Sequence, residues 1–307
     1  MKQRWEKLGQ IYTPGTIRHP KLASHAANPL PIHFDGDVYR VFFSGRDDQN
    51  RSSVGAVDID IVQRRVITEH QHPFFEHGPE GSFFADGVSI GNCYSVNGLH
   101  YMLFMGWQAP HNEHWRGDIG RLIVSPNLAT LHLDDNSPLM SSDTTDPISL
   151  SYPWVLNRDD SNYAMWYGST STWDAGNEEM IHTINYASSD DGHAWIRHGL
   201  AVPYEIGVIQ AFSHPTVVRS RSGEYEMWFS FRSGSGQKYR IGYATSVDGE
   251  SWKLDLRNKC LDISSVGWDS EMIEYPFVFD HAGQRYMLYN GNGYGKTGFG
   301  LAVLSDG

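Results

Sequence analysis

The sequence repeats itself at a near-constant interval, and this repetition limits the fold more than any other feature. Five segments of alternating apolar and polar residues begin at Tyr39, Tyr101, Tyr163, Tyr225 and Tyr286, at intervals of 62, 62, 62 and 61 residues. Such alternation, rich in aromatic and β-branched residues, is typical of β-strands. A fixed interval over most of a 307-residue chain indicates copies of one structural unit. We expect the five Tyr side chains to lie in the core.

Each repeat contains the signals of four strands. A turn rich in Gly, Asn or Asp precedes the repeated Tyr, and a short strand precedes that turn, which is a β-hairpin pattern. A third strand follows. In two repeats an Asp-Gly turn then leads to Trp195 or Trp252, which introduces a fourth strand. The pattern predicts an all-β fold, a five-bladed β-propeller of four-stranded antiparallel blades, as a single domain over residues 1–307.

The two ends of the chain carry complementary parts of one repeat. The C-terminal LAVLSDG stops after a third strand, whereas WEKLGQIYTP from Trp5 resembles the fourth-strand segment WIRHGLAVP from Trp195. We therefore expect the N-terminal strand to complete the last blade and close the ring. A β-sandwich or two β domains is the alternative, but the spacing is too regular for unrelated hairpins.

Charge and hydropathy exclude several classes of partner. The formal net charge is −12, so nucleic acid and anionic membrane surfaces are not expected as partners. No apolar run approaches the roughly 20 residues of a membrane-spanning helix. The N-terminal MKQRWEKLGQ lacks the apolar stretch of a signal peptide, so we expect a cytoplasmic protein. The oligomeric state is left open.

A propeller places its ligand site at one mouth of the central channel. The first strand of each blade lines the channel, and its start lies beside the end of the second strand. Residues at these two places in all five repeats should therefore converge on one concave mouth, where ligands commonly bind. The candidate catalytic residues there are Asp47, Asp86, Glu271 and Glu274. The candidate substrate-binding residues are His25, Arg46, Trp107, Tyr152, His214, Arg232 and Tyr275.

This mixture of side chains suits a carbohydrate. Aromatic faces pack against the C–H side of a sugar ring, while Asp, Asn, His and Arg bind its hydroxyl groups. Cleavage of a glycosidic bond needs two carboxyl groups, one protonated and one ionised. Neighbouring carboxylates push each other's pKa values apart, which helps one stay protonated. Two Arg and two His at one mouth also favour an anionic sugar, because Arg pairs bidentately with carboxylate or phosphate.

Each candidate also has a plainer structural role. Asp86 suits an Asx turn at a strand start, and Asp47 suits a turn cap or a pair with Arg46. Glu271 and Glu274 could be ordinary loop carboxylates. The two His residues could bind backbone groups between blades, and Tyr152 and Tyr275, which precede prolines, could simply pack there.

Motifs for other chemistries are missing from the sequence. HNEH, from His111 to His114, is not a zinc-protease HExxH motif, and no Cys/His array has zinc spacing. There is no nucleophile elbow and no Walker loop. The glycine-rich NGNGYGKTG lies between two strands, which indicates a hairpin loop. We therefore expect no cofactor and assign no metal ligands.

The repeat layout over the whole chain resembles the five-bladed propeller glycosidases, the superfamily that includes glycoside hydrolase families 32, 43, 68 and 130. The segments FSGRDD, FFADGV, SYPWV, SHPTVV and EYPFV look most like the family 43 and family 130-like branch. Family 43 members carry an Asp in the first blade, an Asp in the second and a Glu in the third. The resemblance transfers only Asp86, because SHAANP and LSYPW hold no carboxylate. Glu271 or Glu274 would have to supply the other.

The sequence therefore favours a carbohydrate-active enzyme, glycoside hydrolase-like, that acts on a glycosidic bond of an oligosaccharide or sugar conjugate. A glycoside phosphorylase or glycosyl transferase is an alternative, because a phosphate nucleophile would replace a missing carboxylate. A non-catalytic glycan-binding propeller is a second alternative, favoured by the missing first- and third-blade carboxylates. A scaffold that uses its rim for protein contacts is a third, against which the polar mouth argues.

Overall fold

A computed structural model describes residues 3–15, 19–159, 161–220, 222–234, 236–257 and 261–306 of the chain. Within these ranges the regular structure is β-strand, apart from one short 3-10 turn, η1 (Pro20–Leu22). None of the helical structure in these ranges has the length and hydropathy needed to span a bilayer. The prediction of an all-β chain is confirmed.

The strands form five antiparallel units of four. The first three units contain β2 (Ser24–Asp35), β3 (Val38–Arg46), β4 (Ser52–Asp60) and β5 (Arg65–Glu69); β6 (Gly87–Val96), β7 (Leu99–Gln108), β8 (Arg116–Val124) and β9 (Leu131–Leu133); and β10 (Ser149–Asp159), β11 (Asn162–Thr172), β12 (Ile181–Ser189) and β13 (Ile196–Leu200). The last two contain β14 (Ala211–Arg219), β15 (Tyr225–Arg232), β16 (Arg240–Ser246) and β17 (Lys253–Leu254); and β18 (Glu274–His281), β19 (Gln284–Asn290), β20 (Phe299–Asp306) and β1 (Gln3–Tyr12).

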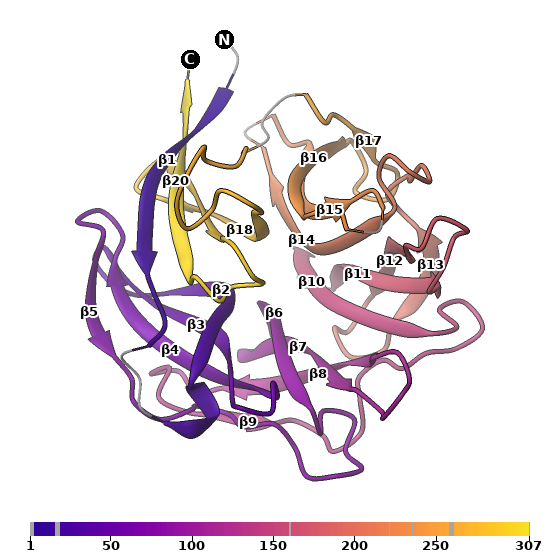
Figure 1. The fold of residues 1–307 in the computed structure, drawn as a ribbon, viewed down its shortest axis with the longest axis horizontal. Helices are drawn as coiled ribbons and strands as arrows, with labels where there is room; N and C mark the ends of the chain where they lie inside the picture. The colour runs from indigo at the N-terminus through magenta and orange to yellow at the C-terminus, as the bar shows by residue number, and fades with distance from the viewer. Residues whose placement is uncertain are drawn as a thin grey trace.

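The five units follow one another around a common centre, with their first strands innermost (Figure 1). Each first strand contacts the first strands of the units on both sides, and β18 of the last unit contacts β2 of the first. The third strand of one unit meets the first strand of the next in two single parallel bridges, Ser52 with Gly87 and His182 with Ala211. These bridges place the starts of β6 and β14 beside the third strands of the preceding units.

The two ends of the chain lie side by side in the last unit, where the indigo β1 runs along the yellow β20 (Figure 1). The antiparallel register extends from Gln3 opposite Asp306 to Tyr12 opposite Phe299. The N-terminal strand thus occupies the fourth-strand position that β5, β9, β13 and β17 hold in the other units.

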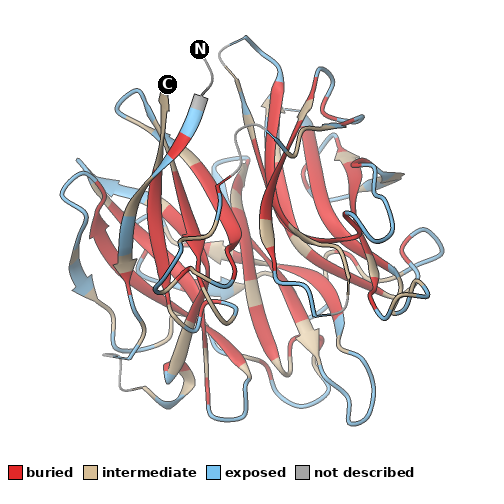
Figure 2. Ribbon diagram, turned by 45° about the horizontal axis from the view of Figure 1, so that its top comes forward, coloured by how far each residue is buried: buried red, intermediate tan, exposed pale blue. Residues whose placement is uncertain are grey.

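Local sequence accounts for the hairpins and the core. In the β6–β7 hairpin, Asn97 and Gly98 have φ values of 49° and 79°, the left-handed pair that a two-residue hairpin turn requires. The repeated Tyr39, Tyr101, Tyr163 and Tyr225 are buried, as expected, and Tyr286 is partly buried. Figure 2 shows buried segments along the strands and exposed segments in the outer loops.

Candidate active site

One irregularity recurs in the first strand of every unit. The pairing register between the first and second strands skips at residues 28–29, 91–92, 152–153, 214–215 and 275–276. An irregularity of this kind, a β-bulge, bends the strand and redirects its side chains. The five bulges lie at equivalent places in the five units, near the starts of their first strands.

Four of the five bulges hold a non-glycine residue in the left-handed conformation. The φ values are 55° for Asn28, 39° for Tyr152, 50° for His214 and 52° for Tyr275, and each of these residues precedes a proline. Non-glycine residues seldom adopt such values, and the strain of order 1 kcal/mol or more per residue is concentrated at functional sites in proteins. The four strained residues therefore indicate a candidate functional site near the bulges.

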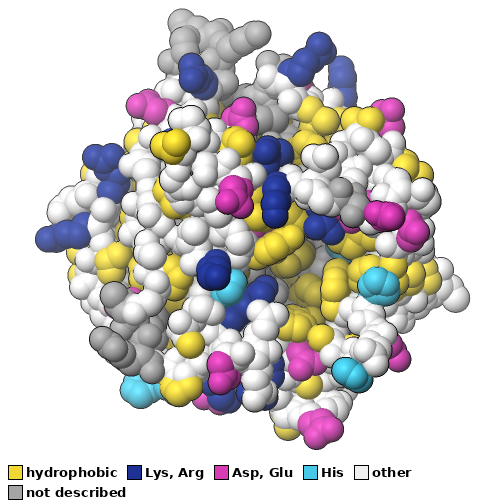
Figure 3. All heavy atoms as spheres, in the orientation of Figure 1, with side chains coloured by type: hydrophobic (Ala, Val, Ile, Leu, Met, Phe, Trp, Pro, Cys, Tyr) yellow, Lys and Arg dark blue, Asp and Glu magenta, His cyan; other side chains and the backbone are white. Residues whose placement is uncertain are grey.

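A cavity of about 310 Å³ opens at the centre of the five units. Figure 3 shows the hollow, with hydrophobic and aromatic side chains in yellow on its floor and Lys or Arg side chains in dark blue at its edge. Five of the seven predicted substrate-binding residues line it: Arg46, Trp107, Tyr152, Arg232 and Tyr275. All five units contribute, so the cavity depends on the whole repeat arrangement.

The sequence analysis missed one group of lining residues. Each unit also contributes a residue from the connection between its second and third strands: Asn50, Trp115, Met180, Tyr239 and Tyr294. In an antiparallel unit the third strand begins where the second ends, so this connection opens on the same face as the start of the first strand. The strand order alone could have identified these positions. The lining residues within the strands were missed as well: Ser89, Met105, His182, Phe212 and Ser213.

The tyrosines form a packed cluster at the cavity. The Tyr152 and Tyr275 hydroxyl groups lie 3.3 Å apart, and their ring centroids are 5.4 Å apart. Burial raises the pKa of both phenols and of Tyr239, so all three stay protonated at neutral pH and can donate hydrogen bonds. Phenol rings with protonated hydroxyl groups suit the apolar and polar faces of a sugar ring.

Glu274 begins β18, directly before the bulge at Tyr275, and it is completely buried. Neither carboxyl oxygen has a hydrogen-bond partner of normal geometry. Burial raises the pKa of this carboxyl well above its ordinary value, although Arg46, Arg232 and the backbone of Tyr294 oppose the shift. Burial therefore favours the neutral, protonated form of this carboxyl, which lies among residues that line the cavity.

The other three candidate carboxylates have different surroundings. Asp47 accepts hydrogen bonds from the backbone N–H groups of Gln49 and Arg51 and pairs with the Arg51 guanidinium at 2.8 Å, so its carboxylate caps its own turn. Asp86 accepts from the backbone N–H of Ala109 at 2.8 Å and lies half-buried. Glu271 is exposed. None of the three lines the cavity.

The two candidate histidines lie beside the cavity rather than among its lining residues. Burial, with the nearby charges of Arg46 and Lys296, lowers the pKa of His25 to about 4. His214 is buried and packs against the rings of both Tyr152 and Tyr275, and burial lowers its pKa to about 4. Both imidazoles are therefore uncharged at neutral pH. The lining His182, held between the Ser151 and Thr170 hydroxyl groups at 2.6 Å each, is also uncharged, because burial lowers its pKa to about 3.

The two lining arginines differ in their partners. The Arg232 guanidinium pairs with the buried Glu179, with Nε 2.7 Å from Oε2 and Nη2 donating to Oε1 at 3.0 Å. It also lies over the Tyr239 ring, 5.0 Å from the centroid. Arg46 instead donates from Nη1 to the neutral amide oxygen of Asn50 at 2.7 Å. In the described part of the chain no carboxylate lies within ion-pairing distance of Arg46.

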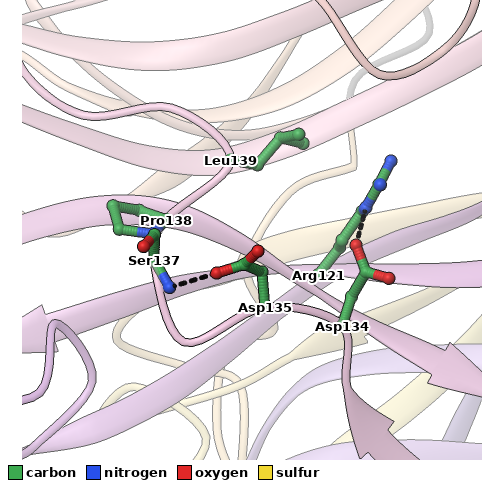
Figure 4. A pocket seen from close by; sticks show the side chains of 6 residues that line it. All are labelled: Arg121, Asp134, Asp135, Ser137, Pro138 and Leu139. Atoms are coloured by element: carbon green, nitrogen blue, oxygen red, sulfur yellow. Dashed lines mark hydrogen bonds and ion pairs between the residues drawn. The ribbon is translucent and has the colours of Figure 1, made fainter.

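A second hollow, of about 220 Å³, lies between β8 and the segment that follows β9 (Figure 4). Its Arg121 donates to Asp134 at 2.6 Å and stacks on the Tyr101 ring at 4.2 Å, so the guanidinium is already engaged. Across the described residues no group of three or more His, Cys, Asp or Glu side chains is arranged to hold a metal ion. Because all five units contribute side chains to it, the central cavity is the candidate site.

Solved structures share this architecture. A structure described as a glycoside hydrolase matches with a TM-score of 0.74 and 15% identity, covering 99% of this protein and 91% of that one. A glycosyl hydrolase from Bacteroides ovatus matches with a TM-score of 0.71 and 10% identity, over 99% and 94%. A thermostable family-43 glycoside hydrolase matches with a TM-score of 0.66 and 14% identity, over 96% and 91%. The protein therefore shares the fold of these glycoside hydrolase structures, in agreement with the resemblance drawn from the sequence.

Sequence comparison adds closer relatives. No protein-family model matches the sequence. Two Mycobacterium tuberculosis proteins described as uncharacterized, MT1551 and Rv1502, are each 42% identical to it over 305 residues, which cover 98% of this protein and 99% of each relative. This identity extends over nearly the full length of both proteins, and the chain therefore belongs to the same family as MT1551 and Rv1502.

Proposed function

We propose that the protein is a carbohydrate-active enzyme, glycoside hydrolase-like, that acts on a glycosidic bond at the mouth of a central channel. In this proposal the five units are the blades of a single-domain propeller, and β1 closes the ring. The contacts between neighbouring first strands and the pairing of β1 with β20 support that arrangement.

The state of Glu274 is the observation that carries the proposal. A general acid must hold its proton at the working pH, and burial among the lining residues raises the pKa of this carboxyl and so favours its protonated form. Glu274 would give its proton to the leaving oxygen of the glycosidic bond. Asp86 is the proposed second carboxylate, because its backbone N–H donates to the carbonyl oxygen of the cavity-lining Trp107 at 3.1 Å.

The remaining side chains suit the sugar itself. Trp107 and Trp115 offer flat apolar faces to the C–H side of a pyranose. The protonated phenols of Tyr152, Tyr239 and Tyr275 supply hydrogen-bond donors for its hydroxyl groups. A volume of about 310 Å³ accommodates one to two sugar rings.

A glycan-binding propeller without turnover is the second candidate, and two observations favour it. Glu274 is 0% exposed, so it reaches a substrate only if the lining side chains shift. The carboxylates of Asp47 and Asp86 already accept backbone hydrogen bonds. A phosphorylase is the remaining alternative, because one protonated carboxyl and a phosphate nucleophile suffice for that reaction.

A turnover screen tests the proposal. Wild-type protein, Glu274→Gln and Asp86→Asn would be incubated with neutral and acidic glycosides, with and without inorganic phosphate. Release of sugar by wild type, reduced about 100-fold or more in Glu274→Gln, supports the enzyme. A requirement for phosphate identifies a phosphorylase. Sugar binding without any release, in wild type as in both variants, contradicts the enzyme and identifies a binding protein.

A further inference from the structure

The positive charge at the cavity is unevenly distributed. On one side, the positive charge of Arg232 is neutralised, because two nitrogen atoms of its guanidinium lie against the carboxylate of Glu179. Glu179 is only 4% exposed. The three histidines at or beside the cavity carry no charge at neutral pH. An incoming anion therefore finds no net cation on that side of the site.

The opposite side of the cavity holds an uncompensated cation. Arg46 ends β3 and lines the cavity, and the one hydrogen-bond partner of its guanidinium among the described residues is the neutral side chain of Asn50. The carboxylate of the neighbouring Asp47 forms an ion pair with the Arg51 guanidinium and accepts a hydrogen bond from the Arg51 backbone N–H. Burial raises the pKa of Glu274, the carboxyl on which Arg46 acts electrostatically, and so favours its neutral form over a charged partner for Arg46.

A second cation lies near the first. Lys296 is exposed and lies in the connection between β19 and β20, two residues after the cavity-lining Tyr294. Its charge and that of Arg46 both lower the pKa of His25. The loop that carries Lys296 is fixed to β2: the backbone N–H of Ala26 donates to the Gly295 carbonyl oxygen at 2.9 Å. Asn290, just before the loop, accepts from the Asn28 backbone N–H at 2.9 Å and donates to the Ala26 carbonyl oxygen at 2.7 Å.

We propose that Arg46 and Lys296 form an anion subsite of the cavity, which binds the carboxylate or phosphate group of an acidic sugar, while the Arg232–Glu179 pair contacts uncharged hydroxyl groups. This inference rests on the proposed carbohydrate function of the cavity. It assigns the selectivity for acidic over neutral sugars to the side of the cavity formed by the first and last units. A guanidinium with free N–H donors matches either oxyanion group bidentately.

Calorimetric titration tests the subsite with glucose, glucuronate, glucose 6-phosphate and inorganic phosphate as probes. The proteins compared are wild type, Arg46→Gln, Lys296→Gln and Arg232→Gln, with Lys253→Gln, an exposed lysine on β17, as the matched control. Arg46→Gln should weaken binding of the acidic sugars about tenfold or more and leave glucose unchanged. Lys296→Gln should weaken the acidic sugars less, since its charge is solvent-exposed, and added salt should reduce that effect.

The ratio of acidic to neutral affinity is the diagnostic quantity. Arg232→Gln should change both affinities in parallel and keep this ratio, as should Lys253→Gln. Glucuronate and glucose 6-phosphate distinguish the carboxylate from the phosphate as the preferred group, and inorganic phosphate shows whether the anion binds without a sugar.

Failure of the inference and failure of the proposed function give different results. Acidic sugars that bind through Arg46 without any turnover support the subsite and contradict the enzyme. The subsite is overturned if the protein binds glucose, or cleaves a neutral glycoside, with no preference for acidic sugars. It is also overturned if Arg46→Gln weakens the binding of neutral and acidic sugars equally. Neither result contradicts the enzyme. No binding of any probe overturns both.

Discussion

The ammonium group of Lys7 lies 2.6 Å from Oδ2 of Asp269, although 262 residues separate the two in the sequence. Asp269 is almost fully buried and also accepts from the Tyr289 hydroxyl at 3.0 Å. Unit three repeats the arrangement: the buried Asp146 pairs with Arg197 of β13 and accepts from the Tyr167 hydroxyl. Lys7 of β1 therefore takes the place in the last unit that Arg197 holds in the third.

Replacing Lys7 by Met should destabilise the protein, because it removes the cation from a buried carboxylate and loosens the contact between the chain ends. We expect a loss of about 2–3 kcal/mol in the free energy of unfolding. Urea unfolding measures it, with Arg4→Met, an exposed residue of the same strand, as the control. Equal small losses in the two variants would show that the pair does not hold the ends together.

Gly91→Ala should disrupt the contact between the second and third units. A Cβ atom at Gly91 would lie 2.2 Å from the backbone oxygen of Pro153, at the neighbouring bulge. Because this oxygen belongs to the main chain, relieving the clash requires a backbone shift that costs free energy. We expect a loss of about 2–3 kcal/mol, typical of overpacking. Gly234, which has open space around it, provides the matched Ala substitution. Similar unfolding midpoints for both variants in urea would contradict the close packing of the bulges.

Glu274→Gln should change how stability depends on pH. The pKa of Glu274 is raised well above its ordinary value of 4.5 in the folded protein, so the folded state holds a proton that the unfolded state releases. Stability from this group is present below the unfolded pKa and is lost as the pH rises toward the folded one. As the pH rises above 4.5, the ordinary value, the wild type should lose stability relative to Glu274→Gln. Parallel stability curves over this range would mean that Glu274 is ionised in the folded state.

His214→Asn should reduce the sensitivity to acid. Burial lowers the pKa of His214 from 6.5 to about 4, so its contribution to stability is present above pH 6.5 and is lost as the pH falls through 4. Asn fits the left-handed backbone, because Asn28 occupies the equivalent bulge of the first unit. Unfolding midpoints measured from neutral pH to pH 4 should fall less steeply in the variant. An unchanged slope would exclude a buried neutral imidazole at this position.

The sequence repeat made the fold predictable. The partners and protonation of the side chains at the site depend on the tertiary structure and could not be predicted in the same way. The 62-residue interval and the hairpin turns are local signals, and they located the strands around Tyr39, Tyr101, Tyr163 and Tyr225. Five cavity-lining residues were predicted because they lie at the start of a first strand or at the end of a second strand. The partners of Asp47 and Arg232, which are Arg51 and Glu179, depend on loop conformation and on contacts between units, which no local pattern encodes. The protonated state of Glu274 depends on burial by all the surrounding units.

The most direct test of the central claim, that the channel mouth binds a sugar, is saturation-transfer NMR with a panel of neutral and acidic sugars. Trp107 lines the cavity, so irradiating the protein should transfer saturation to the C–H protons of a bound sugar. The account predicts transfer in wild type and its loss in Trp107→Ala, with transfer retained when the exposed Tyr204 is replaced by Ala. Absence of transfer to every sugar, or transfer that survives Trp107→Ala undiminished, would contradict the account.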